Sequence, residues 1–504
     1  MTTENSTSID ANTARIKEAE NVQVRSAVAL SFAARLSSAV VTLISSMVIA
    51  RLLTPAEMGV YAIGLTLKVL LDTFREFGVG NYLIQEKQLT REKVRAAFSV
   101  TLLLAWTAGG VLVVISEPAA NFYKTPTLAG VILVIAISFF LLPFSAPALG
   151  LLRREFCFAT LYQINVAANV ATAVVNIILA MMGFGAMSMA WGVVAGAAVF
   201  TIFPCASRPS YALMMPTLRG WRPVLTFGGQ STFASIIAQL SESAMQLLIG
   251  RLLGLNALGL FNRAYTLLLF ARTSVFGSLS SVAIPVMAAN IRDGRDIREP
   301  YLRASGLLTG IFWPMQAFLL VMAFPLFRIL YGPRWDAAVP LFQLLMLGDV
   351  AYTALAFVAP VLVAFGRVDY WARGETIVQA ARLALIVPAC FHSLIAVCIA
   401  EDLHYIFFLI VFAYILQLLM GVSFGKLAGA HTKSLLLAVF SFVGPGVSAL
   451  AFGLGSERPL RILIVAGAGA TTGWLLGVYL LSHDLRLEIR RAINWLLVSL
   501  TLRK

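Results

Sequence analysis

The sequence alternates between long apolar runs and short polar segments. Most runs hold about 18 residues or more, enough for a helix to cross the hydrocarbon core of a bilayer. Charged residues, glycine and proline gather in the segments between the runs. The pattern predicts an all-α polytopic membrane protein with about fourteen transmembrane helices. These helices are expected near residues 26–50, 58–80, 96–115, 127–152, 160–182, 186–206, 224–249, 257–287, 304–327, 337–365, 376–399, 403–421, 434–454 and 462–481.

The composition supports a membrane protein and indicates its orientation. Hydrophobic residues make up 59% of the chain and charged residues 12%, whereas soluble domains average about 25% charged. The net charge of +14 does not predict nucleic-acid binding, because the bases lie in short clusters between apolar runs. With a cytoplasmic N-terminus, roughly 25 of the 38 Lys and Arg fall on the cytoplasmic side and about 7 in the opposite loops. We therefore expect a multi-pass protein of the bacterial inner (cytoplasmic) membrane with both termini in the cytoplasm.

The chain repeats itself at an offset of about 200 residues. Residues 51–61 (RLLTPAEMGVY) align with 251–261 (RLLGLNALGLF), and 147–154 (PALGLLRR) correspond to 360–367 (PVLVAFGR). Each repeat holds six predicted helices, an even number, so an axis along the membrane normal relates the two repeats. Two parallel six-helix repeats are therefore expected to form N- and C-lobes around a central cavity, followed by two extra C-terminal helices.

The repeats also set the expected domain boundaries. Residues 1–24 form a cytoplasmic tail, 25–207 the N-lobe and 208–430 the C-lobe, and 431–482 hold the two extra helices. Residues 483–504 place Leu and Ile on one helical stripe beside basic residues, which predicts an interfacial helix on the cytoplasmic leaflet. Rocking of the two lobes would expose the cavity to each side of the membrane in turn.

About ten charged residues fall inside the predicted spans. Each would cost roughly 2.5 to 3.5 kcal/mol at a lipid-facing centre, so they are expected to face a wet cavity or one another. Four of them recur at helical spacing on one face of the second span. We expect a basic pocket open to the cytoplasm. The bases are Arg35, Lys68, Arg75, Arg263, Arg272 and Arg382, and the acids are Asp72, Glu76, Glu242 and Asp349.

Several of these residues have alternative interpretations. Charges three or four residues apart can pair and simply stiffen the bundle. Arg382 lies near the inner end of its span and is expected to extend its head group to the interface. The cavity acids, above all Glu242 and Asp349, which look isolated at mid-depth, are candidates for carrying a coupled proton or cation. Four amides that recur on helix faces could contact sugars or join helices, namely Asn165, Asn169, Gln239 and Gln246.

Neither enzymatic activity nor a cofactor is predicted. Residues 421–425 match G-x-S-x-G but end an apolar helix, outside the strand–turn–helix context that a nucleophile needs. The sequence contains no phosphate-binding G-x-x-x-x-G-K-[ST] loop. The four cysteines form no C-x-x-C pair, so a metal site is not expected either.

Residues 51–61, 77–80 (FGVG), 83–85 (LIQ) and 89–92 (LTRE) resemble the oligosaccharide flippases. Residues 152–156 (LRREF) and 183–185 (GFG) are similar to the exopolysaccharide and lipopolysaccharide export branch, the Wzx-like flippases. This branch belongs to the multidrug/oligosaccharidyl-lipid/polysaccharide superfamily. The resemblance covers about residues 26–430 and is strongest in the first half.

The resemblance implies an alternating-access flippase. It would move polyprenyl-pyrophosphate-linked oligosaccharide repeat units, precursors of exopolysaccharide or lipopolysaccharide, from the cytoplasmic to the periplasmic leaflet. Arginine forks suit a pyrophosphate, so Arg35, Lys68, Arg75 and Arg272 are expected to bind it, with Arg263 further along the outward path. The expected partners are the lipid-linked oligosaccharide, membrane lipids, a polysaccharide polymerase and a chain-length regulator, with no nucleic acid.

Two other functions remain as alternatives. A multidrug cation exporter of the same superfamily would need net acidic, aromatic cavity walls, and six intramembrane bases against four acids argue against it. A membrane-embedded polysaccharide polymerase would need a large extramembrane loop, whereas the longest loop expected here is under about twenty residues.

Overall fold

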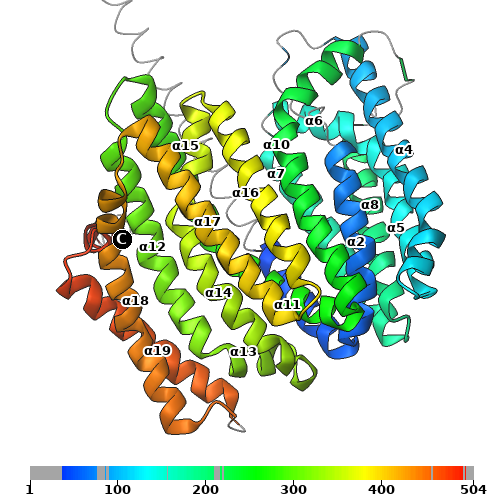
Figure 1. Ribbon diagram of the computed structural model, residues 1–504. Coiled ribbons are helices and arrows are strands. Elements are labelled where there is room, and N and C mark those ends of the chain that lie inside the picture. Colours follow the sequence, from blue (N-terminus) through cyan, green and yellow to red (C-terminus); the bar gives the residue numbers. More distant parts are fainter. Residues whose placement is uncertain are drawn as a thin grey trace, which may run out of the picture. The chain divides into compact units, whose positions relative to one another are not determined.

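The computed structural model describes residues 37–75, 86, 90–155, 157–208, 216–217, 221–455, 458–491 and 494. For residues 222–235, 275, 278, 279, 281, 282, 285 and 288 it describes the backbone alone. The regular structure of these residues is helical throughout (Figure 1). Nine of the described helices are long and apolar enough to cross a membrane. The predicted all-α polytopic membrane fold is confirmed, while the total of fourteen spans stays a prediction.

The chain divides into two compact units. One contains Met1–Leu53 and Leu67–Thr232, and the other contains Thr54–Thr66 and Phe233–Lys504. Helix α2 (Pro55–Arg75) therefore contributes its first half to the second unit and its second half to the first.

The first unit packs its helices through a small apolar core. Val131, Ile135 and Phe139 are fully buried on α5, which contacts α4 and α8. Prolines 143 and 147 interrupt the fourth span, so that a short 3-10 turn separates α5 from α6. The helices of this unit are Ser37–Leu52, the second half of α2, α4 (Arg91–Phe122), α5 (Thr127–Leu141), η1 (Leu142–Ser145), α6 (Ala146–Arg154), α7 (Phe158–Met181) and α8 (Ala186–Ser207).

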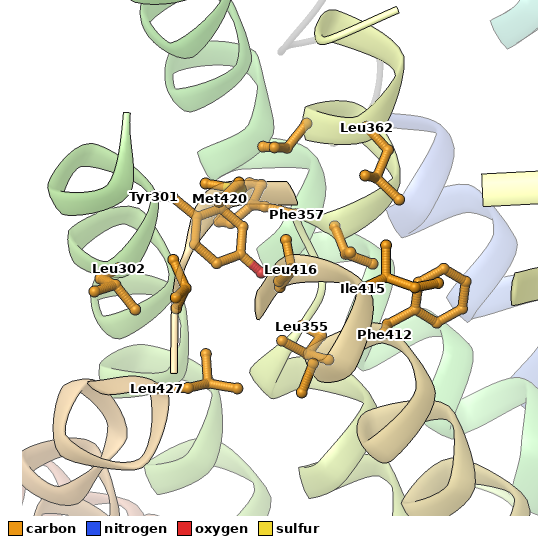
Figure 2. Packing of buried hydrophobic residues seen from close by; sticks show 14 of the residues in the cluster. Tyr301, Leu302, Leu355, Phe357, Leu362, Phe412, Ile415, Leu416, Met420 and Leu427 are labelled. Atoms are coloured by element: carbon orange, nitrogen blue, oxygen red, sulfur yellow. The ribbon is translucent and has the colours of Figure 1, made fainter. Parts of the chain in front are cut away.

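The second unit is larger. It continues through α10 (Trp221–Leu248), which begins before the unit boundary, η2 (Ile249–Leu253), α11 (Leu255–Arg292), α12 (Arg298–Val321), α13 (Ala323–Leu330), η3 (Pro333–Ala338), α14 (Val339–Ala354), α15 (Val358–Ala364), α16 (Val368–Ala389), α17 (Leu394–Met420), α18 (Phe424–Phe452) and α19 (Pro459–Leu480). Its main apolar cluster joins α12, the turn before α15, and α17. Figure 2 shows these side chains interlocked, with Phe357 and Leu355 from the turn lying among α17 residues. Between apolar helices such close packing, more than exclusion of water, supplies the cohesion.

The predicted internal repeat appears as matching local structure. The fourth span of the first repeat breaks between α5 and α6, and its counterpart breaks at residues 355–357, between α14 and α15. Each break is followed by a short helix containing one of the aligned prolines, Pro147 or Pro360.

Two aligned glycines make a reciprocal backbone contact where α2 and α11 cross. A Cβ added to Gly59 would lie 1.9 Å from the carbonyl oxygen of Leu255, and one added to Gly259 would lie 1.9 Å from that of Pro55. Small residues let helix backbones approach this closely. The aligned segments 51–61 and 251–261 are thus symmetric partners in one crossing.

The turn between α16 and α17 differs from the prediction. We expected the chain to reverse at 400–402, where charges interrupt the apolar run, but α16 ends at Ala389 and α17 begins at Leu394. Ser393 caps α17 by accepting a hydrogen bond from the backbone N–H of Ala396 at 3.1 Å. The charged residues Glu401 and Asp402 therefore lie inside a helix.

The segment after α19 docks on α12 and α18 through a buried histidine. His483 is 4% exposed, and its Nδ1 accepts from the Leu485 N–H at 3.2 Å. The proton must then sit on Nε2, which donates to Ser434 Oγ at 3.2 Å. Thr309 Oγ1 links the same hydroxyl to His431. Leu485 adds an apolar contact in a cluster with Leu437 and Val478.

We expect this docking to weaken in acid. Burial lowers the pKa of His483, against the opposing effect of Asp484, because the charged ring loses solvation. A depressed pKa stabilises the native form above the unfolded pKa of about 6.5, and that contribution is lost as the pH falls. The protection factors of the amides in residues 485–491, which are exchange rates corrected for the intrinsic effect of pH, should therefore fall between about pH 7 and pH 5. In the His483→Gln variant the protection factors should not depend on pH in this range; equal dependence in both proteins would contradict the assignment.

Candidate functional site

The second half of α2 carries a charged triad in the first unit. The Lys68 ammonium and the Arg75 guanidinium both pair with Asp72, the latter from Nε to Oδ1 at 2.9 Å. These side chains are between 15% and 18% exposed. Lys68 Nζ also lies 5.7 Å from the centre of the Phe139 ring. Since two bases share one carboxylate, the triad keeps a net positive charge.

The sequence predicted these pairs only as an alternative to ligand binding. Helical spacing brings the three groups together, as the i, i+3 and i, i+4 separations require. Two further members of the expected basic pocket, Arg35 and Glu76, lie outside the described residues.

A buried arginine organises the polar core of the second unit. Arg382 is 4% exposed and pairs with Glu401 through two nitrogens, with Nε to Oε2 at 2.9 Å. Its Nη2 also reaches Glu242 Oε2 at 2.8 Å. Tyr265 Oη lies 3.3 Å from the same Glu242 oxygen. The cluster thus joins α16, α17, α10 and α11.

The expectation that Arg382 reaches the interface is wrong. Its partner Glu401 was placed in a loop, whereas the turn at 390–393 puts that carboxylate on α17 with its side chain 0% exposed. The capping residue Ser393 was the signal in the sequence that could have located the turn.

A second buried pair lies on α11 and α14. Arg272 Nη1 donates to Asp349 Oδ1 at 2.9 Å, and Gln316 donates to Asp349 Oδ2 at 3.0 Å. The Arg272 guanidinium also lies 4.3 Å from the centre of the Tyr352 ring. Arg272 is 16% exposed, whereas Asp349 is fully buried. Neither Asp349 nor Glu242 is isolated, so the isolation that suggested ion coupling is not found.

Arg263 lies in an aromatic enclosure. Its guanidinium carbon is 4.6 Å from the Tyr331 ring centre and 5.0 Å from that of Trp335, and Nη2 is 2.9 Å from Met58 Sδ. The residue is 5% exposed, and no carboxylate among the described residues pairs with it. Cation–π attraction therefore takes the place of an ion pair.

Three of the four amides, Gln246, Gln239 and Asn165, make hydrogen bonds, mainly within their own helices. Gln246 joins two helices, since it donates to Glu242 Oε1 at 3.2 Å and accepts from Thr66 Oγ1 on α2 at 2.9 Å. Gln239 donates to Ser243 Oγ, and Asn165 donates to the Leu161 carbonyl oxygen. Asn169 is half-buried on α7. Gln246 therefore forms an interhelical hydrogen bond, one of the two interpretations that the sequence allowed.

The structure also changes the balance of intramembrane charge. Besides the exposed Asp369 in the first turn of α16, three acids that the sequence analysis did not count lie within α16 and α17, namely Glu375, Glu401 and Asp402. The number of acidic residues in the spans is therefore no longer smaller than the number of basic residues. The argument from charge against a cation exporter does not hold. Among the described residues, no cluster of three His, Cys, Asp or Glu side chains could hold a metal ion.

Comparison with known proteins identifies the family. The profile of the family described as polysaccharide biosynthesis protein matches residues 48–340. Teichuronic acid biosynthesis protein TuaB of Bacillus subtilis (strain 168) is 24% identical over 405 residues, which cover 78% of this chain and 83% of TuaB. Lipopolysaccharide biosynthesis protein WzxC of Escherichia coli (strain K12) is 23% identical over 329 residues, 65% of this chain and 67% of WzxC.

Solved structures show the same fold. Lipid II flippase MurJ in an inward closed conformation superposes with a TM-score of 0.75 at 14% identity, covering 91% of this chain and 99% of MurJ. An inward-facing multidrug resistance MATE family transporter of the MOP superfamily gives a TM-score of 0.56 at 15% identity, covering 76% of this chain and 95% of that one. Because the family profile spans more than half of the sequence, the chain belongs to the polysaccharide biosynthesis protein family.

Proposed function

We propose that the protein is an alternating-access flippase that moves a polyprenyl-pyrophosphate-linked oligosaccharide from the cytoplasmic to the periplasmic leaflet. The family match over residues 48–340 carries this proposal. It is supported by relatives named for lipopolysaccharide and teichuronic acid biosynthesis and by the fold shared with a lipid II flippase. Cytoplasmic termini, an inner-membrane location, and a polymerase and chain-length regulator as partners belong to the same proposal.

The ion pairs of Arg75 and Arg272 suggest how the binding site is stabilised when no substrate is bound. A charged guanidinium group inside a membrane protein is costly in free energy when no ligand is bound, unless a counter-charge lies beside it. Asp72 and Asp349 supply that counter-charge to Arg75 and Arg272. A pyrophosphate, which carries more negative charge than a carboxylate, would compete for the same guanidinium groups. When it leaves, the carboxylate takes its place again, so binding is reversible.

The candidate residues then have different roles. Lys68, Arg75 and Arg272, together with Arg35, would bind the pyrophosphate, the triad doing so with its net positive charge. Arg263 is enclosed by Tyr331 and Trp335 in this conformation. It would contact substrate only after these rings move away. The candidates for sugar contacts remain the four amides Asn165, Asn169, Gln239 and Gln246. The candidates for ion coupling remain the four acids Asp72, Glu76, Glu242 and Asp349.

Removal of the pyrophosphate-binding charge is the test. In a strain lacking the gene, we expect wild-type protein to restore polymer export, and the Arg35→Ala/Arg75→Ala variant to fail while reaching the membrane in normal amount. Lipid-linked oligosaccharide should then accumulate on the cytoplasmic leaflet. For the second unit, Arg272→Gln with Asp349→Asn removes the charge but leaves no buried carboxylate unpaired; this variant should also lose export.

The control variant is Arg328→Ala, which breaks an exposed pair with Asp336. It should export normally. Normal export by the Arg35/Arg75 and Arg272/Asp349 variants would show that these bases do not bind the substrate. Full export in the strain lacking the gene, with new sensitivity to lipophilic cations, would instead favour the multidrug exporter, which the acids of α16 and α17 allow.

A further inference from the structure

A polar cavity lies at one end of the second unit and shares no residue with the charged clusters described above. Its volume is about 370 Å³, within the range of about 300 to 1,000 Å³ usual for small-ligand sites. Its walls come from the first turns of α12 and α18 and from the chain just after α19. The lining residues are Glu299, Leu302, Arg303, Gly306, Lys426, Gly429, Ala430, Lys433, His483 and Asp484.

The cavity lies where two apolar helices begin. Both α12 and α18 are long and apolar enough to cross a membrane. They run parallel, because Gly306 near the start of α12 faces the Ala430 backbone, and Met322 just past its end packs against Ala449. Their charged residues are confined to the early turns. This is the level at which a lipid bilayer presents its headgroups.

Two of the three bases in the cavity already have partners. Arg303 donates to Glu488 at 3.1 Å and lies 3.9 Å from Asp484. Lys433 Nζ donates to the Ser482 carbonyl oxygen at 3.1 Å. These contacts hold the chain after α19 against the mouth of the cavity, and they use only part of the donor capacity of Lys433.

One base and one acid in the cavity have no such partner. Within the described part of the chain, neither the Lys426 ammonium nor the Glu299 carboxylate makes an ion pair with a charged group within 4 Å. The nearby Asp296 interacts electrostatically with Lys426, but its direct ion pair is with Arg298. Both are exposed on the first turns of their helices. Opposite charges that line one cavity without pairing are available to a ligand that carries both signs.

The mixed charge limits the chemistry of that ligand. An anion alone would meet the carboxylates of Glu299 and Asp484, and a cation alone would meet the lysines. The starts of α12 and α18 add partial positive charge, which favours a phosphate. A phosphate tethered to an ammonium satisfies both sets of groups, and its N–H donors suit a carboxylate.

We propose that this cavity binds the phosphoethanolamine headgroup of a membrane phospholipid, with its phosphate on Lys426 and Lys433 and its ammonium on Glu299. The bound lipid connects α12 to α18 at the membrane surface. This site is independent of the proposed transport activity, since it shares none of the residues assigned to the pyrophosphate.

Gly429 offers a variant that fills the cavity without changing charge. A Cβ added there meets no heavy atom within 4 Å, so Gly429→Ala should fold normally. The larger Gly429→Leu side chain would occupy the space of the headgroup. Together with Lys426→Ala and Glu299→Gln, it separates loss of space from loss of charge.

Native mass spectrometry of the full chain in detergent can measure lipid retention. We expect phosphatidylethanolamine to be retained about tenfold more strongly than phosphatidylcholine, whose ammonium has no N–H donor, or phosphatidylglycerol, which has no ammonium. Lys426→Ala and Glu299→Gln should each lower retention of phosphatidylethanolamine about tenfold, and Gly429→Leu should abolish it. Gly429→Ala and Arg334→Ala, the latter an exposed base outside the cavity, should bind like wild type.

Three outcomes would overturn the proposal. Equal retention of the three lipids would show that the headgroup is not recognised, and preference for phosphatidylglycerol would show an anion site. Unchanged phosphatidylethanolamine binding in the three cavity variants would place the lipid elsewhere. Free phosphoethanolamine serves as the soluble probe: if it binds while the phospholipid does not, the lipid assignment is wrong.

Discussion

Replacement of Arg382 by alanine is expected to remove most of the folded protein from the membrane. The substitution leaves Glu401, which is 0% exposed, and Glu242, whose side chain is 22% exposed, without their shared counter-charge. Breaking a buried ion pair in this way costs about 3 to 5 kcal/mol, a large part of the stability of most domains. Fluorescence-detected size-exclusion chromatography should show a much smaller monodisperse peak, and thermal melting in detergent a much lower Tm.

The cost should come from the unpaired carboxylates and not from the lost side chain. A variant with Arg382→Met, Glu401→Leu and Glu242→Gln removes all three charges and should recover most of the stability. Arg328→Ala breaks the exposed pair with Asp336 and should cost under about 1 kcal/mol. If the Arg382→Ala variant has the same Tm as the Arg328→Ala control, the cluster does not contribute to the stability of the fold.

Substitution of Gly59 by alanine is expected to disrupt the crossing of α2 and α11. The added methyl would lie 1.9 Å from the carbonyl oxygen of Leu255, so the helices must separate. Overpacking costs about 1 to 3 kcal/mol, and a collision with backbone belongs at the upper end. Gly259→Ala should cost a similar amount, because it meets the Pro55 carbonyl in the same way. Thermal melting of each variant provides the measurement.

Two further variants make this test specific. Gly110 lies within α4 and has no heavy atom within 4 Å of an added Cβ, so Gly110→Ala should be neutral or stabilising. In the Gly59→Ala/Gly259→Ala double variant, the second methyl enters helices that have already separated. The loss of stability in the double variant should therefore be smaller than the sum of the losses in the two single variants. Additive costs would mean that the glycines do not share one contact.

Much of the fold could be predicted because it depends on local patterns. Apolar runs of bilayer length predict helices, and the repeat at residues 51–61 and 251–261 predicts two related halves. The break at 390–393 could not be read in the same way. The charged residues Glu401 and Asp402 interrupt the apolar run, so the pattern predicts a loop there unless the buried partner of Glu401 is known. A charge that is paired within the membrane and a charge in a loop have the same local pattern.

The candidate site shows the same division. The triad of Lys68, Asp72 and Arg75 follows from helical spacing alone, and it was predicted. The pairing of Arg272 with Asp349 joins residues 77 positions apart in the sequence, and that of Arg382 with Glu242 joins residues 140 apart. Such pairs depend on how helices pack, which one sequence does not reveal. The basic residues and three of their acidic partners, Asp72, Glu242 and Asp349, were therefore found. The long-range pairings between them, and the fourth partner Glu401, were not.

The contact between the two glycines has the form of an isologous interface, in which one position meets a second and the second meets the first. A chain with a single repeat could form it only by pairing with another copy of itself. Joining two copies in one polypeptide makes the same contact intramolecular, so its formation no longer depends on protein concentration. Two repeats in one chain need not stay identical, and the aligned positions 54–57 and 254–257 read Thr-Pro-Ala-Glu and Gly-Leu-Asn-Ala. The crossing thus has, within one chain, the two-fold form of a contact between two copies.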